Sequence, residues 1–234
     1  MEASDCEIVQ LGFREGHAQL LSIDSLFCLV HWDLQESVTP TALKRVQLPE
    51  DANFGFSSCL YMLGFHSSDP ENVNHAYIGT TTGNIYFYSL NDKALMQHSV
   101  KRQQLLQTKN ARICDIRAHP LKPHRLLLVY KDVAVAVYSM NKHEFIQHLK
   151  GKVAIAAEWV FPKGELFAVV MASGYVQTFK AESSNQTPIQ SVNLGCGEIG
   201  EAAFSILPNS LVQTKKQLPN NQLYLMAKTK PCND

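Results

Sequence analysis

The stretch whose spacing most resembles a chemical motif is GCGEIG at 195–200, which matches the G-x-G-x-x-G pattern of dinucleotide-binding folds. In those folds the pattern follows a strand and opens a helix, and an acidic residue about 20 positions further on holds the ribose. Here the following segment EAAFSIL stops at Pro208, and residues 201–233 contain no acid after Glu201. A glycine-rich loop is therefore the favoured interpretation, and we expect no cofactor.

Three potential metal ligands, Cys114, His119 and His124, fall within eleven residues. A closed zinc site usually has four ligands, and the sequence offers no second cysteine pair. Cys114 is expected within a strand, whereas the two histidines flank the prolines of the turn HPLKPH. A turn histidine that is hydrogen-bonded to the backbone is the favoured interpretation, and we expect no metal.

Residue sets for nucleophilic or acid–base catalysis are missing from the sequence. It contains no G-x-S-x-G elbow, no His-Glu-x-x-His and no pair of carboxylates in an apolar context. Asp33 follows Trp32 and forms the Trp-Asp pair that names one class of propeller repeats. Its expected role is to close a strand and its turn. We therefore predict that the protein is not an enzyme and assign no catalytic residue.

Charge is unevenly distributed along the chain. Residues 1–51 hold nine acids against three bases, whereas Asp115 is the one acid between residues 101 and 131. A patch of this kind could attract an acidic partner or an anionic lipid surface. In the alternative, the charges lie on several loops and strands and face different directions. The eight basic residues of this stretch are Lys101, Arg102, Lys109, Arg112, Arg117, Lys122, Arg125 and Lys131.

The elements that must position these residues are short strands. Residues 76–90 read AYIGTTTGNIYFYSL, in which two apolar runs flank Thr82-Gly83-Asn84, a turn that tolerates positive φ, so a β-hairpin is predicted. Successive side chains of a strand point to opposite faces, and here both faces are apolar, so both must be covered. Segments of the same form recur as LLSIDSLFCLVHWDL (20–34), LLLVYKDVAVAVYSM (126–140) and LFAVVMASGYVQTFK (166–180).

Each hairpin follows another strand-like piece, which gives a self-similar unit with a period of about 40 to 50 residues. A series of such units is typical of propeller blades, each of which packs against a neighbour on both faces. The sequence thus predicts an all-β fold, a WD40-like β-propeller with about four to five blades and an incomplete ring. The aromatic-type positions in register are Phe13, Phe65, His119 and Phe161 in the first pieces, and Trp32, Tyr88, Tyr138 and Phe179 at the ends of the hairpins.

The blade units divide the chain into a partial propeller over 1–192 and a remainder, 193–234, that is expected to be a degenerate blade or a poorly ordered tail. The segments VQLP and PIQSV, in the connections after the first and fourth units, could each add a short outer strand, and residues 91–112 could hold either a helix-compatible stretch or an outer strand followed by a basic loop. The predicted blade units lie near 5–34, 56–90, 112–140 and 153–180.

Composition is that of an ordinary globular protein, with 45% hydrophobic and 18% charged residues. The balance of 21 acidic against 21 basic residues gives no reason to expect nucleic acid. The start MEASDCEIVQ lacks the basic and apolar regions of a secretory signal, and no apolar run approaches the roughly 20 residues that span a bilayer. The six cysteines are not closely paired, so we expect reduced thiols in a cytosolic protein.

Taken in order, the units resemble the first propeller of the lethal giant larvae and tomosyn (syntaxin-binding) family, over about residues 5–182. AYIGTTTGNIYFYSL is similar to that family's LGTESGNVFV hairpin, and IVQLGFREGHAQLLSIDSLFCLVHWDL to the blade whose second strand reads LLS...LHLW. ICDIRAHPLKPHRLLLVYKDVAVAVYSM resembles the blade I..HP..P..LLIGY..G.VV.WD, and AIAAEWVFPKGELFAVVMASGYVQTF the blade after it. The matching positions are Gly79, Gly83, His119, Pro120, Pro123, Leu127, Tyr130, Trp159, Gly174 and Tyr175.

The resemblance implies a non-catalytic scaffold in the cytoplasm, peripheral at the plasma membrane or cell cortex. Members of this family bind SNARE proteins of the syntaxin and SNAP-25 type and regulate exocytosis and cell polarity. Some also engage non-muscle myosin II, polarity kinases or Rab GTPases. The alternative function is that of a generic propeller adaptor in another cytosolic complex.

The chain also departs from the family pattern. It matches only part of the first propeller, and Val133 stands where the third hairpin would have its glycine. Four or five blades cannot close an ordinary ring and would leave open sheet edges. We therefore expect a fragment, a shortened gene product, or a protein that is completed by a partner.

Overall fold

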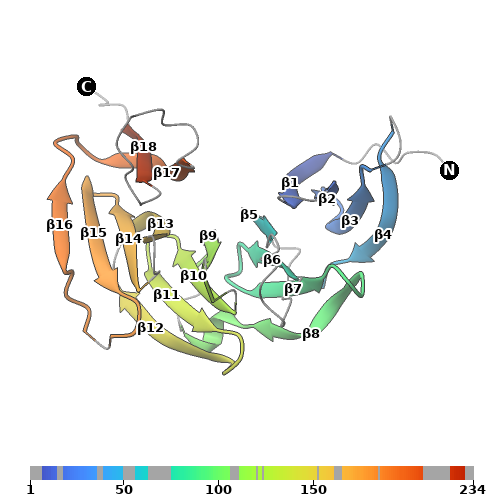
Figure 1. Ribbon diagram of the computed structural model, residues 1–234, viewed down its shortest axis with the longest axis horizontal. Coiled ribbons are helices and arrows are strands. Elements are labelled where there is room, and N and C mark those ends of the chain that lie inside the picture. The colour runs from blue at the N-terminus through green and yellow to red at the C-terminus, as the bar shows by residue number, and fades with distance from the viewer. Residues whose placement is uncertain are drawn as a thin grey trace, which may run out of the picture. The chain divides into compact units, whose positions relative to one another are not determined.

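The computed structural model of this chain is all-β, as predicted. It describes residues 7–14, 18–35, 39–49, 56–62, 75–105, 111–119, 121–122, 124–151, 153–160, 165–183, 185–207 and 222–229. Over these residues it contains the strands β1 to β18 and a short 3-10 helix, η2 (Arg102–Gln104), but no α-helix. The strands form four four-stranded antiparallel sheets and one two-stranded sheet (Figure 1).

Two compact units make up the chain, Met1–Ile116 and Arg117–Asp234. The first unit holds two sheets whose strands pair in chain order, β1-β2-β3-β4 and β5-β6-β7-β8. Each is therefore a meander, in which every strand pairs with the next one along the chain. The strands are β1 (Ile8–Arg14), β2 (Gln19–Asp24), β3 (Cys28–Asp33), β4 (Thr41–Gln47), β5 (Phe56–Met62), β6 (His75–Thr80), β7 (Ile85–Ser89) and β8 (Ala94–Val100).

The remaining sheets follow the same rule. The third has the order β12-β11-β10-β9, and its strand β9 (Ile113–Ala118) contains the boundary between the units. The fourth has the order β13-β14-β15-β16, and the fifth comprises β17 and β18 in the described part of the chain. The strands are β10 (Arg125–Tyr130), β11 (Ala134–Ser139), β12 (Glu144–Lys150), β13 (Ala154–Val160), β14 (Leu166–Met171), β15 (Tyr175–Lys180), β16 (Gln190–Asn193), β17 (Ile199–Leu207) and β18 (Gln222–Thr229).

The hairpin predicted at 76–90 is formed by β6 and β7, and both of its faces are buried, as predicted. All of β7 and five of the six residues of β6 are buried. Ile78 and Tyr86 pair on one face and belong to an apolar cluster. Tyr77 and Phe87 pair on the other face, with their rings edge to face and their centroids 5.5 Å apart. Both faces of the hairpin are therefore apolar because both are buried.

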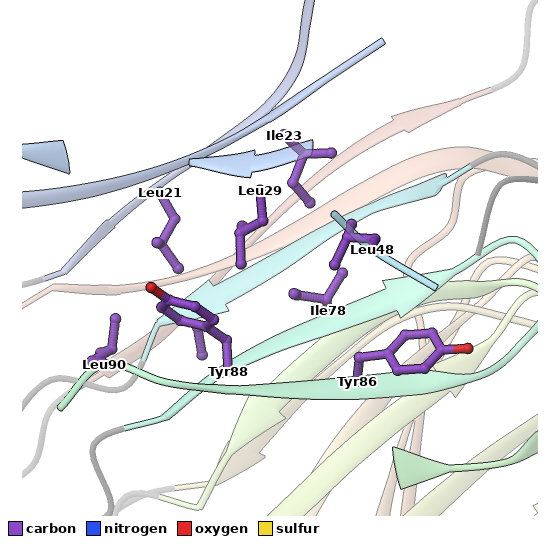
Figure 2. Close-up of a cluster of buried hydrophobic side chains, with 9 residues drawn as sticks. Leu21, Ile23, Leu29, Leu48, Ile78, Tyr86, Tyr88 and Leu90 are labelled. Atoms are coloured by element: carbon purple, nitrogen blue, oxygen red, sulfur yellow. The ribbon is translucent and has the colours of Figure 1, made fainter. Parts of the chain in front are cut away.

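The apolar cluster of the first unit joins its two sheets. Leu21 and Leu29 from the first sheet lie against Ile78 and Tyr88 from the second (Figure 2). Each fully buried leucine or isoleucine side chain contributes about 1.5–3 kcal/mol through removal of apolar surface from water. This packing holds the β6–β7 hairpin and, with it, the turn at 80–84.

Each predicted blade unit covers the first three strands of a sheet, and the fourth strand lies beyond it. β4 and β16 lie in the connections after the first and fourth units, where the sequence allowed a short outer strand. The sequence did not predict β12. β16 is exposed at every residue and β4 at five of its seven, whereas β12 has one exposed residue among 144–149, so its mixed polar and apolar sequence, not its exposure, made it difficult to recognise. In the segment 193–234, β17 and β18 pair over Ile199–Leu207 and Gln222–Thr229.

Candidate functional site

Loops at one end of the third and fourth sheets bring polar side chains of the second unit together. Alternate connections of a meander lie at the same end of the sheet, so the β9–β10 and β11–β12 turns are neighbours. The N–H of Met140 donates to the carbonyl of His124 at 2.8 Å and ties these turns together. An ion pair between Arg125 and Glu182 adds the connection after β15. We call this region the loop surface, and it comprises Leu121, Lys122, Arg125, Lys142, His143 and Glu182.

The electrostatics of the loop surface centre on Glu182. The hydrogen bond from the Arg125 guanidinium lowers the pKa of the Glu182 carboxyl below its usual value, and slight desolvation opposes this shift. The positive charges of Arg125, Lys122 and Lys142 lower this pKa further. Glu182 therefore lies in a positive electrostatic environment. Because the Glu182 side chain is half exposed, the pair contributes little to stability.

An exposed apolar side chain accompanies these charges. Leu121 is 61% exposed and precedes Lys122 in the turn. The ammonium of Lys142 is 3.7 Å from the Glu144 carboxylate, and both of these side chains are largely exposed. An exposed apolar side chain beside long cationic side chains is compatible with binding to an acidic protein surface.

His119 orders the β9–β10 turn from inside. It is 3% exposed, and its Nδ1 accepts hydrogen bonds from the N–H groups of Leu121 and Lys122, each at 3.0 Å. Its main-chain N–H donates to the carbonyl of Arg125 at 2.8 Å. The structure agrees with the interpretation of a turn histidine bonded to backbone, and His119 fixes the loop that presents Leu121 and Lys122.

Trp159 supports His119 from the fourth sheet. The two ring centroids are 4.6 Å apart, and the indole Nε1–H donates to the carbonyl of Arg117 at 3.2 Å. The buried Glu158 carboxylate lies 3.5 Å from Nε of Arg117. Trp159 also pairs across the sheet with Phe167, which pairs with Phe179. This aromatic row holds the inner side of the loop surface in place.

The predicted basic stretch is divided in the second unit. Lys122 and Arg125 belong to the loop surface, whereas Lys131 lies in the turn at the other end of β10. A six-residue strand spans about 20 Å, so these positions occupy opposite ends of the sheet. Arg117 is engaged with Glu158.

The basic residues of the first unit have local roles. The Lys101 ammonium donates to the Tyr86 hydroxyl at 3.3 Å and lies 5.0 Å from the centre of that ring. The N–H of Arg102 donates to Oδ1 of Asn84 at 3.0 Å, which ties η2 to the β6–β7 turn. Arg112 is exposed, and Lys109 lies outside the described residues.

The motifs considered for cofactor and metal binding do not have the neighbouring elements or ligands that such sites have in other proteins. GCGEIG follows β16, and its last two residues begin β17, so a strand stands where a dinucleotide fold has a helix. Gly195 has φ of 68°, as a loop glycine can. Within the described ranges, no three side chains from His, Cys, Asp and Glu come together as a metal site would require.

The other predicted repeat positions lie on strands and turns. Oδ1 of Asp33 accepts a hydrogen bond from the N–H of Gln35 at 2.9 Å, and so closes the turn after β3 as expected. The Trp32 indole donates to the Ser22 hydroxyl at 2.8 Å. Gly79, Tyr88, Tyr130, Tyr138 and Phe179 lie on strands, and Gly83 and Gly174 have positive φ in turns. Phe65, Pro120 and Phe161 lie outside the described residues, as does the side chain of Phe13.

Buried tyrosines give the fold a predictable sensitivity to alkali. Burial raises the pKa of Tyr88 to about 12 and that of Tyr138 to about 12. The unfolded phenol loses its proton near pH 10, so stability that is present below pH 10 is lost as pH rises from 10 to 12. Each shift corresponds to roughly 3 kcal/mol. We expect the free energy of unfolding of Tyr88→Phe to fall less between pH 10 and pH 12 than that of the parent chain, by the contribution of one buried tyrosine. Urea denaturation at pH 8 and at steps up to pH 12 measures this difference.

The same variant at pH 8 supplies the control for this experiment. At pH 8, Tyr88→Phe should cost about 1 kcal/mol, because the Tyr88 hydroxyl is 3.3 Å from Nδ1 of His31. An alkaline transition that is identical in Tyr88→Phe and the parent chain would contradict the prediction.

Sequence reasoning missed four members of the loop surface. Lys142, His143 and Glu182 are distant in sequence from Lys122, and Leu121 is a single apolar residue within a turn. The β-hairpin pattern could have revealed them. Once the limits of the strands are known, alternate turns of a meander can be placed at the same end of the sheet.

Comparisons with known proteins assign no family to this chain. No protein-family model matches it, and no curated protein matches its sequence. None of the helices in the described part of the chain is long and apolar enough to cross a membrane. The class that the coordinates define is therefore an all-β protein of successive four-stranded meander sheets.

Proposed function

We propose that the chain forms consecutive blades of a WD40-like β-propeller and acts as a non-catalytic scaffold that binds a SNARE protein of the syntaxin type. The observation that carries the proposal is the succession of four meander sheets of four strands each, the architecture of propeller blades. Contact between the leading strands of successive sheets, β1 with β5 and β13 with β17, supports it. The choice of a syntaxin-type SNARE as partner comes from the resemblance of the blade series to the lethal giant larvae and tomosyn family.

Binding is favoured over catalysis by the character of the loop surface. Its charged groups are exposed or paired with one another, and its apolar member, Leu121, points to a contact with a macromolecule. A rigid sheet that presents loops is a common platform for protein recognition. The resemblance to the lethal giant larvae and tomosyn family implies that the scaffold would act at the cytoplasmic side of the plasma membrane, in exocytosis and cell polarity. It also implies SNAP-25-type SNAREs, non-muscle myosin II, polarity kinases or Rab GTPases as further candidate partners.

Isothermal titration of the full chain with the cytosolic part of a syntaxin-type SNARE tests the proposal. We expect binding, and we expect Leu121→Asp and Lys122→Glu each to weaken it by about tenfold, because both residues are exposed on the loop surface. Both substitutions lie in an exposed turn, so the fold should persist, which circular dichroism would verify.

Lys131→Glu is the matched control, since it makes the same charge change at the opposite end of β10 and should leave the affinity unchanged. Absence of binding by a folded chain would contradict the SNARE assignment. Affinity purification that recovers another cytosolic complex without SNAREs would then support the generic adaptor.

A further inference from the structure

The connection between β15 and β16 is an exposed segment with fixed ends. It runs over residues 181–189, and main-chain hydrogen bonds tie both of its ends to the fourth sheet. Its first N–H donates to the carbonyl of Glu165 and its last N–H to the carbonyl of Thr178, each at 2.8 Å. Residues 185–187 lie between these ties, belong to no helix or strand and are all exposed. Their side chains are therefore accessible from solvent in the folded chain.

Thr187 is the nucleophilic side chain of this exposed segment. Its main-chain N–H donates to Oδ1 of Asn185 at 2.9 Å. No described residue forms a hydrogen bond with its hydroxyl group. Pro188 follows directly, and a proline disfavours a helical backbone at the residue before it. The structure thus presents a threonine hydroxyl on an irregular, exposed segment in front of a proline.

A hydroxyl residue followed by proline is the acceptor pattern of one class of protein kinases, the proline-directed kinases. Proline lacks the N–H group and has a fixed φ, so a kinase that binds this pattern must accept the ring and form no hydrogen bond to that position. The sequence contains two such pairs, Thr39-Pro40 and Thr187-Pro188. The second pair is the better-defined site, because residues 36–38 lie outside the described residues, whereas 185–193 are described throughout.

The same threonine belongs to a second pattern. Asn185-Gln186-Thr187 matches the acceptor sequence for N-glycosylation, in which a sugar is attached to the asparagine. A proline directly after the threonine is unfavourable for that reaction, whereas a proline-directed kinase requires it. Pro188 therefore favours phosphorylation of Thr187 over glycosylation of Asn185.

We propose that Thr187 is the phosphorylation site of a proline-directed serine/threonine kinase. The oxygen of the Thr187 hydroxyl attacks the γ-phosphorus of ATP and forms a P–O bond, while the bond between this phosphorus and ADP breaks and the hydroxyl proton is released. The phosphate adds a charge of about −1.5 to −2 and three acceptor oxygens at neutral pH.

Phosphorylation of Thr187 would change the charge at one end of the fourth sheet. Glu182 is the only charged residue in the sequence from 181 to 189, and its ion pair with Arg125 makes it part of the loop surface. Five residues of extended chain span at most about 18 Å, so the Thr187 backbone lies within this distance of the Glu182 backbone. The loop surface would therefore gain a negative charge nearby. The modification itself does not depend on SNARE binding, because it requires only the exposed connection.

Incubation of the purified full chain with a proline-directed kinase and Mg-ATP tests the proposal. Mass spectrometry of proteolytic peptides then locates the phosphate. We expect phosphate on Thr187 of the folded chain. Thr187→Val keeps a branched side chain of similar size but lacks the hydroxyl, so it should abolish incorporation at this position. Because Thr187 is exposed, the fold should tolerate the change, which circular dichroism would verify.

Pro188→Ala is the matched variant, because it keeps the threonine hydroxyl and removes only the proline. It should slow phosphorylation of Thr187 by about tenfold, since the kinase selects the ring at this position. Equal rates for Pro188→Ala and the parent chain would overturn the proposal. So would an unmodified Thr187 in the folded chain. A synthetic peptide of residues 181–193 would then give the reason: a labelled peptide would show that the fold hides the site, and an unlabelled one that the sequence is not a substrate.

Discussion

Trp159→Ala is expected to lower the free energy of unfolding by about 3–5 kcal/mol, the largest effect of any single side-chain truncation considered for this chain. Trp159 is fully buried and is the central member of the contacts behind the loop surface. Its ring packs on His119 and lies edge to face with Phe167 at a centroid distance of 6.2 Å. Alanine would leave a cavity and remove the hydrogen bond from the indole to the Arg117 carbonyl. Urea denaturation followed by far-ultraviolet circular dichroism measures the change.

Two further variants separate packing from hydrogen bonding. Trp159→Phe keeps an aromatic ring in the row but removes the Nε1–H, so it should cost less than the alanine variant, and the lost hydrogen bond accounts for about 1 kcal/mol of that cost. Trp32→Ala removes the other tryptophan, which is only partly buried, and should cost less than Trp159→Ala. A loss below about 1 kcal/mol for Trp159→Ala would show that the row does not support the fold.

Trp159→Ala also links the fold to the loop surface. His119 accepts both turn N–H groups, and its ring is held against Trp159. Loss of the indole therefore loosens the loop that carries Leu121 and Lys122. We expect partner binding to weaken in Trp159→Ala even under conditions in which the chain remains folded.

The hairpins could be predicted from the sequence because local patterns dictate them. At 76–90, turn residues lie between two apolar strands, and the structure forms β6 and β7 there. The outer strands could be predicted less well, because β12 (Glu144–Lys150) mixes polar and apolar residues and its burial depends on neighbours that are distant in the chain. Gln147 illustrates this: it is a polar residue in an outer strand, yet it is only 5% exposed.

The candidate site depended still more on tertiary structure. His119 could be predicted as a turn histidine, since prolines flank it in HPLKPH. Its neighbours could not, because Glu182 reaches Arg125 across 57 positions of sequence. The eight basic residues between 101 and 131 left open either a single patch or charges that face different directions, and β10 separates Arg125 from Lys131. Sequence proximity of charges is a weak guide when each strand carries the chain to the opposite end of a sheet.

Gly83→Ala is expected to destabilise the first unit by about 2–5 kcal/mol, through two separate penalties. Gly83 has φ of 81° in the β6–β7 turn, where a residue with a Cβ is strained. A Cβ at this position would also collide with the main-chain carbonyl oxygen of Ala111 and crowd the Arg102 side chain at 3.1 Å. The carbonyl belongs to the backbone and cannot rotate away, so the turn must shift. Chemical denaturation and hydrogen exchange of residues 75–90 measure the cost.

Gly151→Ala is the matched control for Gly83→Ala, because it introduces the same strain without the collision. Gly151 has φ of 67°, and a Cβ built on it meets no atom within 4 Å. Alanine there should cost only about 1 kcal/mol, the conformational penalty alone. The difference between the two variants therefore measures how tightly the turn at 80–84 is enclosed by Ala111 and η2. Equal losses for Gly83→Ala and Gly151→Ala would mean that the turn has room to move, and that η2 does not hold the end of the β6–β7 hairpin.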